Sequence, residues 1–364
     1  MGATLSTYAT NRDNNFNLIR FIAAALVLYS HSYPLSKGPN VNDPLATLID
    51  MTWGGIAVDV FFITSGFLIT YSFFSRNNII AFIWARILRI YPALFVAIVF
   101  CVFVVGLFFT TNTISDYLFD PQTFKFFRRN VTLFSGVKYE LPGVFTDNPY
   151  MNAVNGSLWT LPYEIKMYTY LAIIASLFLY VQRWLGKNTL KMTFLSIAII
   201  SVATHIANHF LSFSADEFIR LFAMFFIGAA FYIFRNHIFI SSRIFLIILL
   251  VLSLSVINKD LFFVVYSISI PYLVFYIAYV PAGKIREYNR IGDYSYGMYI
   301  YAFPVQQSVA AILPGISVAW MVVISFGITL LLALLSWHLI EKNFLQMKGH
   351  YVAIEKILRI PKLN

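Results

Sequence analysis

The sequence is poor in charge and almost without cysteine. Only 12% of its 364 residues are Asp, Glu, Lys or Arg, whereas ordinary soluble domains carry about 25%. Its single cysteine, Cys101, excludes an internal disulfide, and its place in an apolar run predicts a packing role. The sequence has no Walker loop, no dinucleotide fingerprint and no Gly-x-Ser-x-Gly elbow around Ser65. These absences argue against a soluble domain, a P-loop enzyme, a nucleotide-dependent oxidoreductase and an elbow-type serine hydrolase.

The sequence is instead rich in long apolar runs. Hydrophobic residues make up 59% of the sequence, and stretches of about 20 residues, enough to span a bilayer, recur along its length. We predict an all-α fold, a polytopic transmembrane helical bundle of about ten spans, with residues 1–341 as the transmembrane domain and 342–364 as a basic, amphipathic tail. The predicted spans are 16–35, 53–74, 90–111, 157–182, 192–210, 218–234, 244–257, 261–280, 293–313 and 317–339. The span at 244–257 is short.

Basic residues are divided unequally between the two alternating sets of connecting segments. The positive-inside rule assigns the richer set to the cytoplasm, which predicts that both termini and the tail are cytoplasmic. Cytoplasmic loops and anionic lipid headgroups account for the net charge of +10 without nucleic acid. The poorer, outer set holds only six basic residues: Lys37, Lys125, Arg128, Arg129, Lys138 and Lys259.

The first predicted span contains an arginine and a histidine. Arg20 and His31 are eleven residues apart, close to three helical turns, so they share one helix face about 16 Å apart along the axis. Such side chains are costly in a membrane unless they face a protein interior or a wet cavity. Histidine is well suited to take a proton from a hydroxyl near neutral pH. We predict an intramembrane reaction site; the alternative is a structural role, with His31 bonded to a neighbouring carbonyl.

The fourth predicted span opens from the outer side with Trp159 and Glu164. Tyr168 lies four residues beyond Glu164, on the same helix face. A carboxylate at that depth could orient a histidine or bind an acceptor hydroxyl, and the two aromatic rings could stack on sugar faces. The alternative is that Glu164 forms an ion pair with a neighbouring helix.

Polar residues in the second and third predicted spans offer further candidates. Arg86 and Arg89 are three residues apart at a cytoplasmic helix start, where they could bind the phosphates of a coenzyme A nucleotide or simply anchor the span. Ser65 with Gly66 permits close helix approach, which is the favoured interpretation of Ser65. Asp59 is a candidate polar residue of a pore.

Two other features limit the interpretation. His205 and His209 are four residues apart, but without a third ligand they do not predict a metal site. The longest connection, 112–156, lies outside by the charge rule and is either an acceptor-binding loop or a cap over the helices.

These motifs, in this order, resemble the acyltransferase-3 family of integral membrane acyltransferases across nearly the whole chain. The matching positions are Arg20 with His31; Phe61, Phe62, Ser65, Gly66 and Phe67; Arg86, Arg89 and Pro92; Trp159 and Glu164; Arg220, Phe225 and Gly228; Ser295, Tyr296, Gly297, Met298 and Tyr299; and Glu341 with Lys342. Two positions depart from the pattern. Asn17 stands where the family often has Asp, so Arg20 needs a charge partner from elsewhere. Ala302 stands where the family often has His, which leaves His31 as the better catalytic candidate.

The resemblance implies transfer of an acyl group, usually acetyl, from cytoplasmic acyl-CoA to a hydroxyl of an extracytoplasmic glycan. We therefore expect an acetyl-CoA-dependent O-acetyltransferase of the bacterial inner membrane, acting on polysaccharide or a lipid-linked sugar without a metal. The candidate residues are His31, Glu164 and Arg20 for catalysis, Arg86, Arg89, Arg220 and Ser65 for the donor, and Trp159, Tyr168 and Asp59 for the acceptor. The alternatives are a transporter or flippase for a lipid-linked sugar, and a sensor that binds acyl-CoA without turnover.

Overall fold

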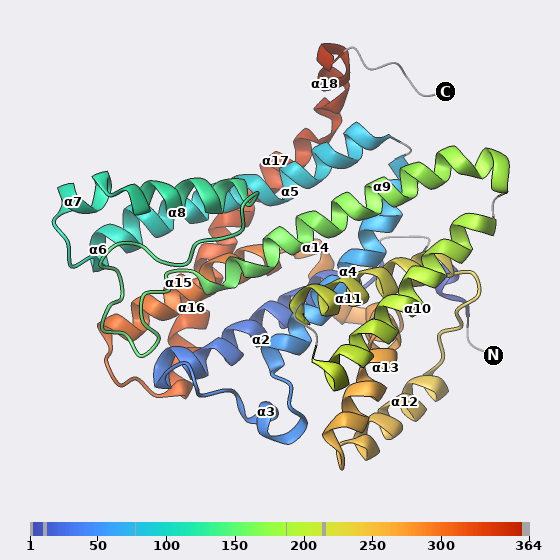
Figure 1. Cartoon of the computed structure of the whole chain (residues 1–364), viewed down its shortest axis with the longest axis horizontal. Coiled ribbons are helices and arrows are strands. Elements are labelled where there is room, and N and C mark those ends of the chain that lie inside the picture. Colours follow the sequence, from blue (N-terminus) through green and yellow to red (C-terminus); the bar gives the residue numbers. More distant parts are fainter. Residues whose placement is uncertain (1–2, 10–12, 77, 187, 213–215, 359–364) are drawn as a thin grey trace. The chain divides into compact units, whose positions relative to one another are not determined.

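The structure is a computed structural model that describes residues 3–9, 13–76, 78–186, 188–212 and 216–358. Helices dominate these ranges (Figure 1), and the described residues form isolated β-bridges but no sheet. The all-α prediction is confirmed. The chain divides into two compact units: unit 1 comprises Met1–Val27, Asp43–Tyr71 and Tyr163–Asp293, and unit 2 comprises Leu28–Asn42, Ser72–Pro162 and Tyr294–Asn364.

Unit 1 consists mainly of long apolar helices. In Figure 1, α10 and α11 run side by side, as do α12 and α13, and each pair is in contact. The helices wholly or largely within this unit are α1 (Leu5–Tyr8), α3 (Pro44–Ile49), α4 (Trp53–Arg76), α9 (Leu161–Leu185), α10 (Asn188–Leu211), α11 (Asp216–Ile233), α12 (Ser242–Ser255), α13 (Lys259–Tyr279) and α14 (Tyr288–Ile291). Helix α2 (Phe16–Lys37) gives its first part to unit 1 and the rest, from Leu28, to unit 2.

Unit 2 is arranged around α5 (Ile79–Val99), α15 (Ser295–Ile312) and α16 (Val318–Ser336), the last two packed against each other (Figure 1). A π-helical segment, Phe100–Gly106, and α6 (Leu107–Phe109) prolong α5. The other helical segments are α7 (Ile114–Phe119), α8 (Pro121–Thr132), the 3₁₀ turn Gly156–Thr160, the π-helical Trp337–Glu341, α17 (Lys342–Gln346), the 3₁₀ turn Met347–His350 and α18 (Tyr351–Leu358).

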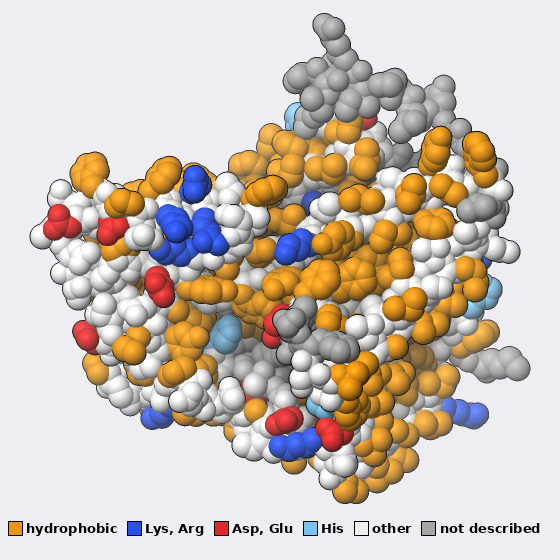
Figure 2. All heavy atoms as spheres, in the orientation of Figure 1, with side chains coloured by type: hydrophobic (Ala, Val, Ile, Leu, Met, Phe, Trp, Pro, Cys, Tyr) orange, Lys and Arg blue, Asp and Glu red, His pale blue; other side chains and the backbone are white. Residues whose placement is uncertain are grey.

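Each of the ten predicted spans overlaps a helical segment, although the helix over the predicted span 90–111 already begins at Ile79. Seven helical segments of the described chain are long and apolar enough to cross a membrane. The predicted spans outside this set fall on α11, α12 and α15. Helix α12 has 14 residues, a rise of about 21 Å, less than the ~30 Å hydrocarbon core. The count of ten spans and the cytoplasmic location of the termini therefore stay predictions. Figure 2 shows apolar side chains over much of the visible surface, as contact with lipid requires.

Helices α4 and α11 approach each other closely enough to exclude any side chain at two glycines. A Cβ on Gly66 would lie 1.9 Å from the carbonyl oxygen of Phe225, and one on Gly228 would lie 2.1 Å from that of Ile63. Small residues allow this backbone contact between membrane helices. The predicted close helix approach is confirmed at Gly66, with Gly228 as the matching residue on α11.

The predicted outer connection, 112–156, has structure of its own. Tyr117 of α7 reaches into the π-helical segment, where its hydroxyl donates a hydrogen bond of 2.8 Å to the Val102 carbonyl. Burial raises the pKa of the Tyr117 phenol, which keeps this donor protonated. Helix α8 carries exposed Lys125 and Arg128 beside part-buried Arg129, and Figure 2 shows Lys and Arg side chains gathered there.

The described part of the tail, residues 342–358, packs against α5. Trp84 donates a hydrogen bond of 3.0 Å from Nε1 to the Met347 carbonyl, and Asn78 donates one of 2.5 Å to Glu355. The predicted helix is present at Tyr351–Leu358; residues 359–364 of the predicted tail lie outside the described residues. Cys101 is buried, in agreement with its predicted packing role.

Candidate active site

His31 lies on a turn of α2 that is fixed to α15. The Gln306 amide donates from Nε2 to the Leu28 carbonyl at 2.8 Å and to Ser32 Oγ at 2.7 Å. The Ser32 hydroxyl in turn donates to the Leu28 carbonyl at 2.9 Å. Gln306 and Ser32 are fully buried, so these bonds form away from competing water. Because Leu28 and Ser32 flank His31, the position of its backbone is set by α15.

The imidazole of His31 is positioned by packing. Its ring meets Phe303 edge to face, with centroids 5.4 Å apart, and Phe303 makes a similar contact with Tyr150 at 6.0 Å. His31 Nδ1 is buried and has no hydrogen-bond partner within the described part of the chain. The structural alternative, a bond from His31 to a neighbouring carbonyl, is therefore not seen at Nδ1. A buried ring nitrogen without a partner is costly in a purely structural role.

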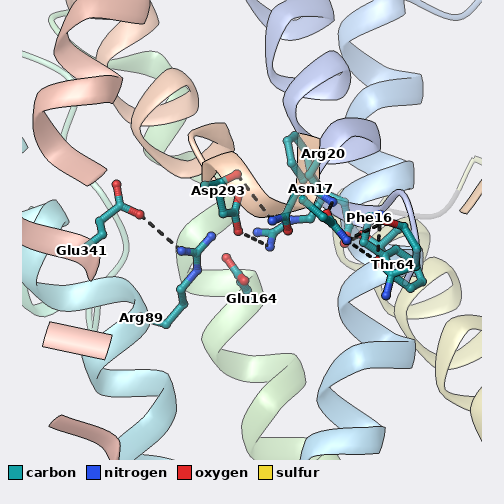
Figure 3. A network of polar contacts seen from close by, with 12 residues as sticks. Phe16, Asn17, Arg20, Thr64, Arg89, Glu164, Asp293 and Glu341 are labelled. Carbon is teal, nitrogen blue, oxygen red and sulfur yellow. Dashed lines mark hydrogen bonds and ion pairs between the residues drawn. The ribbon is translucent and has the colours of Figure 1, made fainter. Parts of the chain in front are cut away.

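Arg89 forms a buried ion pair with Glu341, which belongs to the last of the family motifs. Its Nη1 lies 3.3 Å from Oε2 of Glu341 (Figure 3), and the Ser336 hydroxyl donates to the other Glu341 oxygen at 3.0 Å. Glu341 is only 2% exposed, and the Arg89 guanidinium lies 5.6 Å from the centre of the Tyr296 ring. The positive charge of Arg89 is thus balanced within the protein. Arg86, one turn earlier, lies beside the Phe82 ring.

Arg20 has a charge partner that sequence reasoning did not find. Its Nη1 lies 3.1 Å from Oδ2 of Asp293 (Figure 3), and its guanidinium lies 6.0 Å from the centre of the Phe61 ring. Asn17 donates from its amide to the Gly292 carbonyl at 3.4 Å, next to this pair. Asp293 is one of only 16 acidic residues and precedes the Ser295 motif by two positions. Because acidic residues are so few, each one near a motif was a candidate partner for Arg20.

Asp59 and Arg220, predicted for different ligands, form one ion pair. Arg220 Nε lies 3.1 Å from Asp59 Oδ1, and the Tyr266 hydroxyl donates to Asp59 Oδ2 at 2.9 Å. Asp59 is 1% exposed, so its carboxylate needs this cation and this hydroxyl. The cluster joins α4, α11 and α13. Glu217, half exposed, lies 3.6 Å from the other side of the Arg220 guanidinium.

The first turn of α9 brings Glu164 and Tyr168 together, as their spacing predicts. The Tyr168 hydroxyl donates a hydrogen bond to Glu164 Oε1, and the Tyr168 side chain is buried. In Figure 3 the Glu164 carboxylate is turned toward the Arg20–Asp293 pair. Trp159, on the preceding 3₁₀ turn, is partly exposed.

The predicted site residues are distributed over both units. Unit 2 contains His31, Arg86, Arg89 and Trp159, whereas unit 1 contains Arg20, Asp59, Ser65, Glu164, Tyr168 and Arg220. Among the described residues, no three His, Cys, Asp or Glu side chains gather as metal ligands. His209 instead lies 2.8 Å from Asp260, and His205 packs against Phe263.

Comparison with known proteins decides the family. The acyltransferase-3 model, described as an acyltransferase domain, matches residues 13–338. The chain belongs to the acyltransferase-3 family. An O-acetyl transferase of Shigella phage Sf6 is 28% identical over 357 residues, which cover 95% of this chain and 100% of the relative. Nodulation protein 10 of Rhizobium leguminosarum bv. viciae is 27% identical over 369 residues, with 95% and 97% covered. No solved structure matches.

Family membership and the apolar helices make this chain an integral membrane acyltransferase. In this structure, several acyltransferase-3 motifs that lie far apart in the sequence contact one another. In unit 1, Gly66 of one motif packs against α11, which carries Gly228 of another. In unit 2, the Arg89 motif is bonded to Glu341, and the Tyr296 hydroxyl donates to the Ile90 carbonyl at 3.0 Å. Several motif residues therefore build helix contacts.

Proposed function

We propose that this acyltransferase moves an acetyl group from cytoplasmic acetyl-CoA to a hydroxyl of an extracytoplasmic or lipid-linked glycan, in a bacterial inner membrane. The phage relative is named an O-acetyl transferase, which supports acetyl as the group and oxygen as the acceptor atom. The observation that carries the proposal is His31, held by α15 on an apolar helix with a buried nitrogen that no described residue bonds.

His31 acts as the general base. It takes the proton of the acceptor hydroxyl while the oxygen attacks the thioester carbonyl. The new C–O bond forms, the C–S bond breaks, and the proton passes from the imidazole to the departing CoA sulfur. Alternatively, His31 carries the acetyl group briefly before the hydroxyl takes it. Both routes need a neutral imidazole in a fixed position, and the Phe303 packing and the Gln306 bonds fix that position.

Arg86 is the residue that we assign to the CoA phosphates. A guanidinium binds phosphate oxygens in pairs, but Arg89 already neutralises the buried Glu341 carboxylate. We assign Arg89 to the helix contact, and Arg86 keeps the donor-binding role that the family motif implies. Trp159, partly exposed, is assigned to stacking on the sugar.

The residues of unit 1 keep roles that follow from the family motifs. Arg20, oriented by Asp293, is proposed to interact with the donor carbonyl, and Glu164 with Tyr168 is proposed to bind the acceptor. Asp59 and Arg220 neutralise each other, and Ser65 precedes the tightly packed Gly66. We assign these three to helix positioning rather than to ligand binding.

The test uses labelled acetyl-CoA supplied to inverted membrane vesicles that contain the acceptor glycan. Wild-type protein and the control His350→Ala, changed at an exposed tail histidine, should label the glycan, whereas His31→Ala should not, although it reaches the membrane in equal amount. Label in His31→Ala vesicles would contradict the proposed base. Glycan movement without label in wild-type vesicles would favour the transporter or flippase, and saturable acetyl-CoA binding without product would favour the sensor.

A further inference from the structure

Unit 2 contains a pocket outside the residues assigned so far. It has a volume of about 320 Å³ and lies between the loop at 145–149 and the turn that joins α15 to α16. Phe109, Thr111 and Ala311 contribute to its wall. The positive-inside rule predicts that the loop and the turn that form this pocket face away from the cytoplasm. A concave site of this size is in the range of small-ligand pockets.

The lining combines an apolar face with oxygen atoms. Phe109 and Phe145 pack with ring centroids 5.0 Å apart. Thr111 and the exposed Asp147 also line the pocket, and the Asp147 carboxylate accepts a hydrogen bond of 3.4 Å from the Thr146 hydroxyl. A pyranose ring has a C–H face that packs on aromatic side chains and hydroxyls that donate to a carboxylate. The lining therefore suits a sugar unit.

The pocket wall is rigidly held. Gln307, fully buried on α15, donates from Nε2 to the carbonyls of Tyr150 and Ala153, both at 2.7 Å. Asn148 donates to Gln307 Oε1 at 2.7 Å and to its backbone carbonyl at 2.9 Å. The loop thus keeps its shape without a ligand, and a preformed site loses less entropy on binding.

Helix α15 bonds both the turn that carries His31 and the loop that lines the pocket. Gln306 fixes the His31 turn and Gln307, the next residue, fixes the pocket loop. Ala311 lies eight residues beyond Phe303, the residue that packs on His31. Eight residues correspond to about 12 Å along the helix axis, a longer span than one sugar ring.

We infer that this pocket binds a sugar residue of the acceptor that is distinct from the residue receiving the acetyl group. The inference rests on the proposed function and adds a substrate class to it: a chain of sugars rather than a free monosaccharide. Binding of the distal unit positions the reactive hydroxyl, so that the pocket selects oligomeric acceptors.

The first experiment compares two tryptophan substitutions at adjacent positions. Ala311→Trp fills the pocket, whereas Ile312→Trp changes a side chain that is 60% exposed and outside the lining. Fragments of one to four sugar residues, prepared from the polysaccharide of cells that carry the protein, serve as acceptors with labelled acetyl-CoA. Ala311→Trp should raise KM for the longer fragments at least tenfold, and more than KM for the monosaccharide, whereas Ile312→Trp should match wild type. Equal KM values for Ala311→Trp and wild type would overturn the inference.

A second variant and a binding measurement separate the pocket from the chemistry. Asp147→Asn should weaken binding of the tetrasaccharide in calorimetric titrations, whereas Glu140→Gln, an exposed change elsewhere in the same connection, should not. The titrations use His31→Ala protein, so turnover does not enter. Binding that Asp147→Asn and Ala311→Trp both leave intact would disprove the pocket assignment. If both variants lose tetrasaccharide binding but wild type transfers no acetyl group, the pocket assignment is supported and the proposed function is refuted.

Discussion

Arg20 and Asp293 form an ion pair across 273 residues of sequence, with Nη1 and Oδ2 separated by 3.1 Å. This contact supplies the negative charge that Asn17 does not. The pair is mostly buried, with 19% and 12% of the two side chains exposed. It therefore joins the start of α2 to the segment that leads into α15.

We predict that the charge partner can be moved back to the helix of Arg20. Asp293→Asn should cost about 2 kcal/mol of stability, between exposed and fully buried pairs, and should lower the rate of acetyl transfer. Adding Asn17→Asp places a carboxylate three residues from Arg20, on the same helix face, and should restore at least half of the lost transfer rate. Melting temperatures and initial rates test this; a double variant no better than Asp293→Asn would show that position 293 has another role.

The two arginines of α5 should fail in different ways. Arg89→Ala leaves the Glu341 carboxylate buried without a cation and should cost about 3 kcal/mol of stability. Arg86→Ala should raise KM for acetyl-CoA about tenfold, the effect of losing about 1.4 kcal/mol of phosphate binding. As a control, Arg89→Met with Glu341→Gln should recover stability, because it removes both buried charges. The assignment of Arg86 is wrong if folded Arg86→Ala protein has the wild-type KM for acetyl-CoA.

The Asp59–Arg220 pair should matter far more than its exposed neighbour. Arg220→Met removes the cation that pairs with the buried Asp59 carboxylate and leaves the Tyr266 hydroxyl as its partner among the described residues, which should cost at least ~3 kcal/mol. Glu217→Gln removes a carboxylate that is half exposed, and should change stability by less than about 0.5 kcal/mol. Thermal unfolding in detergent compares the two. Similar melting temperatures for both variants would count against a helix-positioning role.

Two glycine substitutions test the contact between α4 and α11. Gly228→Ala places a methyl group 2.1 Å from the Ile63 carbonyl oxygen, which forces the helices apart and should cost at least ~2 kcal/mol. In Gly327→Ala the new methyl group on α16 meets no atom of the described residues within 4 Å, and the change should be neutral or stabilising by about 0.5 kcal/mol. The yield of folded protein and its melting temperature are the measurements, and equal values for the two variants would refute the close approach.

The sequence sufficed where local pattern determines structure. Apolar runs located the helices, and the four-residue spacing placed Glu164 beside Tyr168. It did not reveal that Arg20 meets Asp293 or that Asp59 meets Arg220, because such partners depend on how distant helices pack. Motif reading likewise treated Arg86 and Arg89 as equivalent. The ion pair between Arg89 and the buried Glu341 became visible only in the folded chain, because it joins segments that lie far apart in the sequence.

Helix α15 has a consequence for biogenesis. Fifteen of its eighteen residues are buried by protein, including two glutamines, and it is outside the seven segments that qualify as spans on their own. Amides near a helix centre make insertion through the translocon unfavourable. We therefore expect α15 to enter the bilayer only once α2 and α5, synthesised earlier, offer carbonyls and hydroxyls to receive it. The enzyme would then reach its folded state only after α15 has inserted, and quality-control proteases would degrade chains in which α15 remains outside the bilayer.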